Sequence, residues 1–75
     1  MGNELHESQL ALLKYFAYDH LPERLQTVSK PFSELANTIR DQIVAGQIEA
    51  NAEATMALRK LLEAKDCAVR AALSL

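Results

Sequence analysis

The stretch Ala54–Leu75, ATMALRKLLEAKDCAVRAALSL, is the longest uninterrupted helix pattern in the chain, and it decides the fold. On a helical wheel of about 100° per residue, one face collects the apolar residues Ala54, Leu58, Leu61, Leu62, Ala68, Val69 and Ala72. An apolar face of this kind must be buried against another element. Lys65 lies near the centre of the same face. The chain must therefore supply both a cover for this face and a role for Lys65.

The segment that precedes this stretch has the most regular apolar spacing in the chain. Along Pro22–Ala45, spacings of three and four residues alternate through Leu25, Val28, Phe32, Leu35, Ile39 and Ile43. Such spacing is typical of a helix seam of about three heptads. Pro31 interrupts it, and a proline costs about 3 kcal/mol in a regular helix interior. Either one helix is kinked at Pro31, or one helix stops near Ser29 and a second begins with Ser29 as its cap. We favour the kinked helix, because the apolar phase continues through Pro31.

A short connection joins the two long stretches. Gly46 is a typical residue just beyond a helix C-terminus, where the left-handed conformation is needed. Asn51 is a suitable cap for the last helix, and Glu53 in its first turn complements the helix dipole. Two long helices joined by so short a loop fold back on each other. The sequence therefore predicts an antiparallel helical hairpin.

The N-terminal part of the chain predicts a shorter helix. Residues 1–7 are polar and are expected to be disordered. Ser8 is a suitable N-cap, and an imperfect apolar stripe follows it at Leu10, Leu12, Leu13, Phe16 and Ala17. Leu21 is a break point, because the residue before a proline avoids the helical conformation. Pro22 then suits the first turn of the next helix.

These patterns together predict an all-α fold in one domain. The expected helices span about 8–18, 22–45 and 52–73. A chain of 75 residues supports only a marginal core by itself. Cys67 is the only cysteine, so a disulfide framework is excluded. Self-association is the remaining way to stabilise the fold, and we therefore expect a homo-oligomer.

Charge and composition limit the partners. The net charge is −2 and the isoelectric point about 5.6, which argues against DNA or RNA as the partner, because nucleic-acid binding needs a basic surface. No apolar run approaches the ~20 residues of a membrane span, so no membrane partner is expected. His6, His20 and Cys67 lack metal-ligand spacing, so neither a metal nor a cofactor is expected. The lone thiol suits a reducing, intracellular setting. A few local cations could still hold a small anion.

Lys65 is the first candidate for such a role. An ammonium group on an apolar face must be paired, reach the surface, or line a wet cavity. Its stem could lie over the core with the ammonium at the surface, or pair with a glutamate across an oligomer interface. Alternatively, oligomerisation could gather several Lys65 side chains around an anion such as phosphate.

The opposite face of the last helix carries alternating charge. Arg59–Glu63 and Asp66–Arg70 are i,i+4 pairs, which support an exposed helix by a few tenths of a kcal/mol each. On spacing alone this is a solvated face. In a functional interpretation, Arg70 would hold a ligand phosphate through two hydrogen bonds.

Three of the four aromatic residues cluster before the Leu21 break: Tyr15, Phe16 and Tyr18. They could plug a small core or offer a stacking platform for a base. Helical spacing favours a core position for Phe16 and leaves the two tyrosines freer. Positive charge near the cluster in sequence comes from Lys14, Arg24 and Lys30.

A catalytic role is not expected. Asp19 and His20 are neighbours that could suggest acid–base chemistry, but no nucleophile or second base accompanies them. His20 is also a possible cap for the helix that begins at Pro22. Cys67 stands beside Asp66, whose negative charge disfavours a reactive thiolate. The chain is therefore not expected to be an enzyme.

Two stretches resemble a known kind of protein: Leu21–Ala36, LPERLQTVSKPFSELA, and Ala57–Ala72, ALRKLLEAKDCAVRAA. They look like small uncharacterised proteins of actinobacterial phages. The order of Phe-x-Tyr, a long helix, Leu-Leu-Glu-Ala and Ala-Val-Arg-Ala also resembles the helical hairpin domain of phage "sponge" proteins. Those proteins counter the CBASS and Thoeris defences by holding cyclic oligonucleotide or cyclic ADP-ribose signals without cleaving them. Asp66-Cys67 stands where that family commonly has Met-Trp.

The resemblance implies a function. The protein would act in the host cytoplasm as a homo-oligomer, often a hexamer in that family, with nucleotide pockets between protomers. Phe16 or Tyr18 would stack on a base, and Arg70 would hold a phosphate. With the charges noted above, the expected ligand-binding residues are Phe16, Tyr18, Arg24, Lys65, Asp66 and Arg70. The alternative is a structural or protein-interaction helical module of a phage, which would dock its helix seams on a partner protein.

Overall fold

A computed structural model of the protein describes residues 4–75. It contains the helices α1 (Glu7–Leu13), η1 (Lys14–Phe16), α2 (Glu23–Val44) and α3 (Ala52–Leu73), where η1 is a short 3-10 helix. Residues 4–75 contain no strand, so the predicted all-α class is confirmed. The molecule is elongated, 45 × 18 × 17 Å. In the described residues, no helix is both long enough and apolar enough to cross a membrane.

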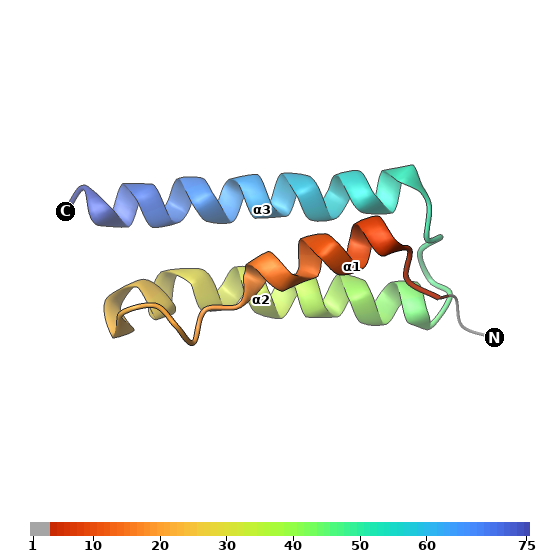
Figure 1. Ribbon diagram of the computed structural model, residues 1–75, viewed down its shortest axis with the longest axis horizontal. Helices are drawn as coiled ribbons and strands as arrows, with labels where there is room; N and C mark the ends of the chain where they lie inside the picture. The colour runs from red at the N-terminus through yellow and green to blue at the C-terminus, as the bar shows by residue number, and fades with distance from the viewer. Residues whose placement is uncertain (1–3) are drawn as a thin grey trace.

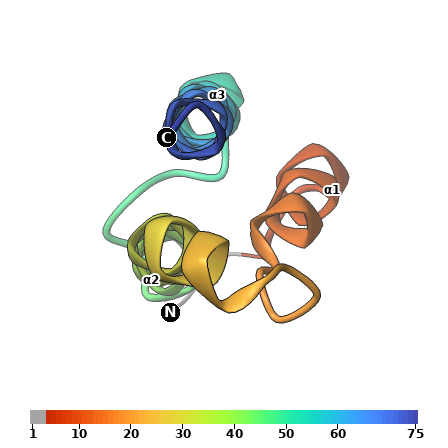
Figure 2. The same cartoon turned by 90° about the vertical axis from the view of Figure 1, so that its left-hand side faces the viewer.

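The helices lie alongside one another. Figure 1 shows α2 and α3 side by side, joined by the loop 45–51 at one end of the molecule. The end-on view in Figure 2 shows that α1 lies beside both of them. α1 begins near the start of α3 and leads through η1 and the segment 17–22 to the start of α2 (Figure 1). Thus α1 is brought against α3, the last helix, along much of the length of α1.

The core forms where the three α-helices meet. Leu12 of α1, Phe16 of η1, Ala36 of α2 and Leu58 of α3 form one buried cluster. Partly buried side chains surround it: Leu13, Phe32, Ile39, Leu61 and Leu62. Each fully buried Leu or Phe side chain contributes about 1.5–3 kcal/mol.

The apolar face predicted for the last helix is turned inward. Ala54, Leu58 and Ala72 are buried, and Lys65 is partly buried among them.

α2 is continuous through Pro31. This confirms the single-helix alternative, and Ser29 is an interior residue of α2 rather than a cap. Pro31 has no N–H group, so the Thr27 carbonyl loses its usual helical donor. Pro31 itself is exposed, which lets water reach this turn. The Ser29 hydroxyl is fully buried and has no hydrogen-bond partner among residues 4–75.

The N-terminal helix differs from its prediction at both ends. α1 begins at Glu7, and its N-cap is His6 instead of Ser8. The His6 Nδ1 atom accepts from the Ser8 backbone N–H at 3.3 Å, and Gln9 Oε1 accepts from the His6 backbone N–H at 2.8 Å. The helix ends at Leu13 and tightens into η1, so the predicted span to residue 18 was too long. The disorder expected for residues 1–7 falls partly on 1–3, which lie outside the described residues.

The other helix ends follow the sequence closely. Asn51 caps α3, and its Oδ1 atom accepts from the Ala54 N–H at 3.2 Å. Gly46 has φ of 80°, as expected of a residue beyond a helix C-terminus. Pro22 is extended and is the N-cap residue of α2. The helix therefore begins at Glu23, one residue later than predicted. No side chain caps α2, so the possible capping role of His20 is not observed.

Candidate functional site

Lys65 ties α3 to η1. Its Nζ atom donates to the Tyr15 carbonyl at 3.1 Å and lies 3.1 Å from Asp66 Oδ1. The Lys65 side chain is 13% exposed, so its stem covers apolar surface while the ammonium group lies at the edge of the core. Because Tyr15 is 50 residues away in sequence, this bond fixes the end of η1 against the C-terminal half of α3.

A pocket of about 400 Å³ opens beside this contact. Its walls come from η1, the segment 17–21 and the C-terminal half of α3. The lining residues are Lys14, Tyr15, Ala17, His20, Leu21, Lys65, Asp66, Val69 and Arg70. We call this space the η1–α3 pocket. Its size lies within the range of small-molecule sites, about 300–1,000 Å³.

Positive charge dominates the η1–α3 pocket. Lys14, Lys65 and Arg70 are cations, and Asp66 is the one acidic residue among those that line it. The whole chain, in contrast, carries a net charge of −2. This local excess of cations suits the pocket to a small anion.

Two of these cations keep donors available. Arg70 Nη2 contacts only the Cys67 sulfur, at 3.2 Å, and no other partner of its guanidinium is found among residues 4–75. Sulfur is a weak acceptor, and a guanidinium has five N–H donors. Lys14 is exposed and forms no ion pair within the described chain. Both side chains can therefore turn toward an anion without breaking a strong protein contact.

Tyr15 supplies an aromatic surface at the rim of the pocket. Its side chain is 66% exposed, although its backbone is fixed by Lys65. An exposed aromatic ring on a fixed backbone can stack on a flat ligand ring. His20 lines the same pocket from the segment that leads to α2.

The residues expected from sequence divide into two groups. Lys65, Asp66 and Arg70 lie together in the η1–α3 pocket, whereas Phe16, Tyr18 and Arg24 do not line it. Phe16 is only 2% exposed and packs in the core, as its helical spacing favoured, so its ring has no free face for a ligand. Arg24 Nη1 donates to the Ala72 carbonyl at 2.7 Å and thereby supplies a donor to a backbone carbonyl in the last turn of α3.

The ion pairs predicted along the outer face of α3 are not present in the described structure. No salt bridge joins Arg59 to Glu63 or Asp66 to Arg70, and Asp66 pairs with Lys65 instead. Arg70 is consequently not neutralised by its neighbour. Lys14, Tyr15 and His20 were noted in the sequence, but only the fold brings them to Lys65 and Arg70. The signal that links them is the Lys65–Tyr15 contact, which no local pattern encodes.

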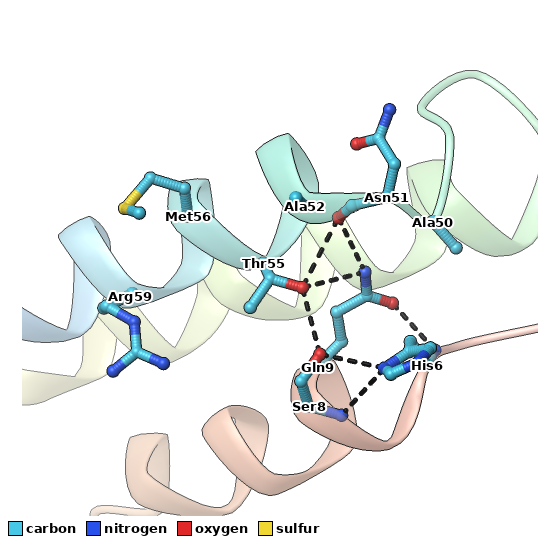
Figure 3. A pocket seen from close by; sticks show the side chains of 9 residues that line it. All are labelled: His6, Ser8, Gln9, Ala50, Asn51, Ala52, Thr55, Met56 and Arg59. Carbon is cyan, nitrogen blue, oxygen red and sulfur yellow. Dashed lines mark hydrogen bonds between the residues drawn. The ribbon is translucent and has the colours of Figure 1, made fainter.

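A second pocket, of about 500 Å³, lies at the other end of α1 (Figure 3). Here Gln9 is fully buried and joins α1 to the start of α3. Gln9 Nε2 donates to the Asn51 carbonyl and to Thr55 Oγ1, both at 3.2 Å, and the Ser8 and Thr55 hydroxyls are 3.1 Å apart. We call this network the Gln9 joint. Its buried polar groups are satisfied by the protein itself, which makes it a structural contact.

No cluster of metal-ligating side chains is found among residues 4–75. Comparison with known proteins finds no family model, no curated protein and no solved structure that matches the chain. The features that bear on function are therefore the η1–α3 pocket and the resemblance of the two quoted stretches.

Proposed function

We propose that the protein binds a small phosphorylated molecule of the cyclic nucleotide class in the η1–α3 pocket and holds it without cleaving it. The observation that carries the proposal is the meeting of Lys14, Lys65 and Arg70 with an exposed Tyr15 around one pocket. Cations suit the phosphates, and the aromatic ring suits a base. A binding protein that sequesters its ligand needs no reacting group.

The biological role in this proposal comes from the resemblance to phage sponge proteins. The ligand would be an immune signal of the cyclic oligonucleotide or cyclic ADP-ribose type, held in the host cytoplasm to inhibit anti-phage defence. α2 and α3 would form the antiparallel hairpin of a homo-oligomer. The oligomer would be a hexamer if the protein assembles as members of that family often do. A pocket of about 400 Å³ on each protomer would then contact one part of a ligand that neighbouring protomers complete.

The test is calorimetry of the purified protein against cyclic di- and trinucleotides and cyclic ADP-ribose isomers. Arg70→Ala should weaken binding by about 1.5–3 kcal/mol, the usual loss for a hydrogen bond to a charged group. The matched control is Arg59→Ala, because Arg59 is an exposed arginine of the same helix that lines the other pocket. If no member of the panel binds, the proposal is wrong.

Two further measurements test whether the ligand is held intact and whether the protein forms an oligomer. Mass spectrometry of small molecules released by denaturing the complex should return the ligand at its original mass. Native mass spectrometry should give a multiple of the 8.3 kDa protomer. A shortened or hydrolysed ligand would indicate an enzyme instead.

A second candidate, a protein-interaction module, is favoured by one observation. A groove of about 850 Å³ lies between α1 and α2, and Leu10, which is 46% exposed, lines it. In this case the groove would receive a partner protein, and Lys65 and Arg70, which do not line the groove, would be dispensable. Leu10→Ser would then abolish function while Arg70→Ala would not.

A further inference from the structure

Asp66 is out of place in a pocket for an anion. It is the one acidic residue among nine that line the η1–α3 pocket. A carboxylate beside a ligand phosphate lowers affinity by repulsion, so its presence calls for a compensating role. Its ion pair with Lys65 explains one oxygen, because Lys65 Nζ lies 3.1 Å from Oδ1.

The rest of the Asp66 carboxylate remains available. The side chain is 46% exposed, and Oδ2 has no hydrogen-bond partner among residues 4–75. An ionised carboxylate has about four acceptor positions, and one is used here. Arg70, the partner expected from i,i+4 spacing, is directed to Cys67 instead. Asp66 therefore offers the unpartnered Oδ2 and the remaining lone pair of Oδ1 to a pocket whose other charged side chains are donors.

We propose that Asp66 selects a guanine base, an inference that rests on the proposed function of this pocket. Guanine carries two adjacent donors, N1–H and the N2 amino group, which match the two oxygens of one carboxylate. Adenine offers an acceptor beside its single amino donor, so the carboxylate faces a lone pair. Hypoxanthine keeps N1–H but lacks the N2 amino group.

The other groups of the pocket fit the same ligand. Tyr15 is available to stack on the purine ring, and Arg70 and Lys14 are available for the phosphate. Lys65 acts through Asp66 and the Tyr15 carbonyl, so it is a positioning residue for both the carboxylate and the aromatic ring.

The experiment compares cyclic di-GMP, cyclic di-IMP and cyclic di-AMP by calorimetry on the wild-type protein and on Asp66→Asn. Wild type should bind cyclic di-GMP roughly tenfold or more tighter than cyclic di-IMP, since one hydrogen bond to a charged group is lost. Asp66→Asn should bring this ratio to about one. It should leave cyclic di-AMP binding unchanged or strengthen it, because a negative charge has left the pocket.

The control is Glu63→Gln, the same carboxylate-to-amide change on an exposed residue of α3 that does not line the pocket. It should keep the wild-type ratio, and circular dichroism should show equal helix content in all three proteins. If Asp66 only held Lys65 in place, Asp66→Asn would weaken all three ligands alike.

Failure of the inference and failure of the proposed function give different results. Equal affinity of the wild type for cyclic di-GMP and cyclic di-IMP would overturn the guanine assignment while leaving nucleotide binding intact. Retention of the wild-type ratio in Asp66→Asn would also overturn it. Binding of none of the three, nor of the wider panel, would remove both.

Discussion

Within residues 4–75, α1 and η1 meet α3 through polar groups at the Gln9 joint and at the η1–α3 pocket. The two regions differ in whether those polar groups have hydrogen-bond partners. At the Gln9 joint, partly buried donors and acceptors meet one another at 3.1–3.2 Å. In the η1–α3 pocket, Arg70 has only a sulfur partner and Lys14 has no ion pair in the described chain.

This difference separates a structural contact from a surface prepared for a ligand. A buried polar group without a partner costs about 1–3 kcal/mol, so a joint must be complete. An exposed cation without a partner costs little and keeps its donors free. We therefore expect changes at the Gln9 joint to lower stability and changes in the η1–α3 pocket to lower binding.

Leu58→Ala should have the largest effect, because Leu58 is fully buried on α3 between the two regions. Leucine-to-alanine changes in a core cost about 2–5 kcal/mol through lost burial and a residual cavity. Urea unfolding followed by circular dichroism measures the loss, and ligand binding should fall with it. The control is Leu75→Ala at the exposed C-terminus. An equal midpoint for the two variants would show that α3 is not held by this core.

Gln9→Met should destabilise the protein by about 1–3 kcal/mol, because it keeps the length of the side chain but removes the Gln9 hydrogen bonds to the Asn51 carbonyl and Thr55 Oγ1 and leaves the His6 backbone N–H without its side-chain acceptor. Gln47→Met is the matched control, since Gln47 is an exposed glutamine in the loop before α3. Thermal unfolding checks the stability, and ligand affinity below the transition should stay at the wild-type value. Loss of affinity without loss of stability would reverse the roles assigned to the two regions.

Arg24→Gln should cost about 0.5–1.5 kcal/mol, the usual net value of one hydrogen bond, because Arg24 donates to the Ala72 carbonyl at the end of α3. Hydrogen exchange should accelerate in the last turn of α3. Nucleotide affinity should not change, since Arg24 does not line the pocket. A clear drop in affinity would return Arg24 to the ligand-binding set predicted from sequence. Arg40→Gln, on an arginine with only local contacts to Asn37 and Asp41, is the control.

Local patterns were sufficient for the two long helices, α2 and α3. Heptad spacing predicted α2 through Pro31, and Gly46 and Asn51 marked the loop, because these signals act within one or two turns of the chain. The start of α1 was harder to predict. His6 is an uncommon N-cap, whose ring nitrogen takes the place of a Ser or Asp oxygen. No local sequence signal favours it over Ser8, which is a more usual capping residue.

The candidate site was only half visible in the sequence. Lys65, Asp66 and Arg70 share one helix, so their proximity follows from helical geometry. Tyr15 and Lys14 reach them through contacts across 50 residues, and the periodicity of either segment does not specify that register. Phe16 was assigned both to the core and to a ligand, and burial decides for the core. Of the two expected i,i+4 pairs, Asp66–Arg70 does not form, and Asp66 pairs with its neighbour Lys65 instead.

Lys65→Leu should change stability least and yet decide most between the two candidate functions. The Lys65 side chain is 13% exposed, its stem already covers apolar surface, and the Tyr15 carbonyl that it would release lies at the surface and can bond to water. The free energy of unfolding should therefore shift by less than about 1 kcal/mol, or rise slightly, because apolar packing often equals a partly buried ionic contact. If the protein binds a nucleotide, the same change removes the group that fixes Tyr15 and Asp66, and affinity should fall by about 1.5–3 kcal/mol. If the protein is an interaction module that uses the α1–α2 groove, function should survive intact. Calorimetry with the tightest ligand of the panel measures affinity, and urea unfolding of the same sample measures stability. The control is Lys60→Leu on the exposed side of α3, which also removes one positive charge.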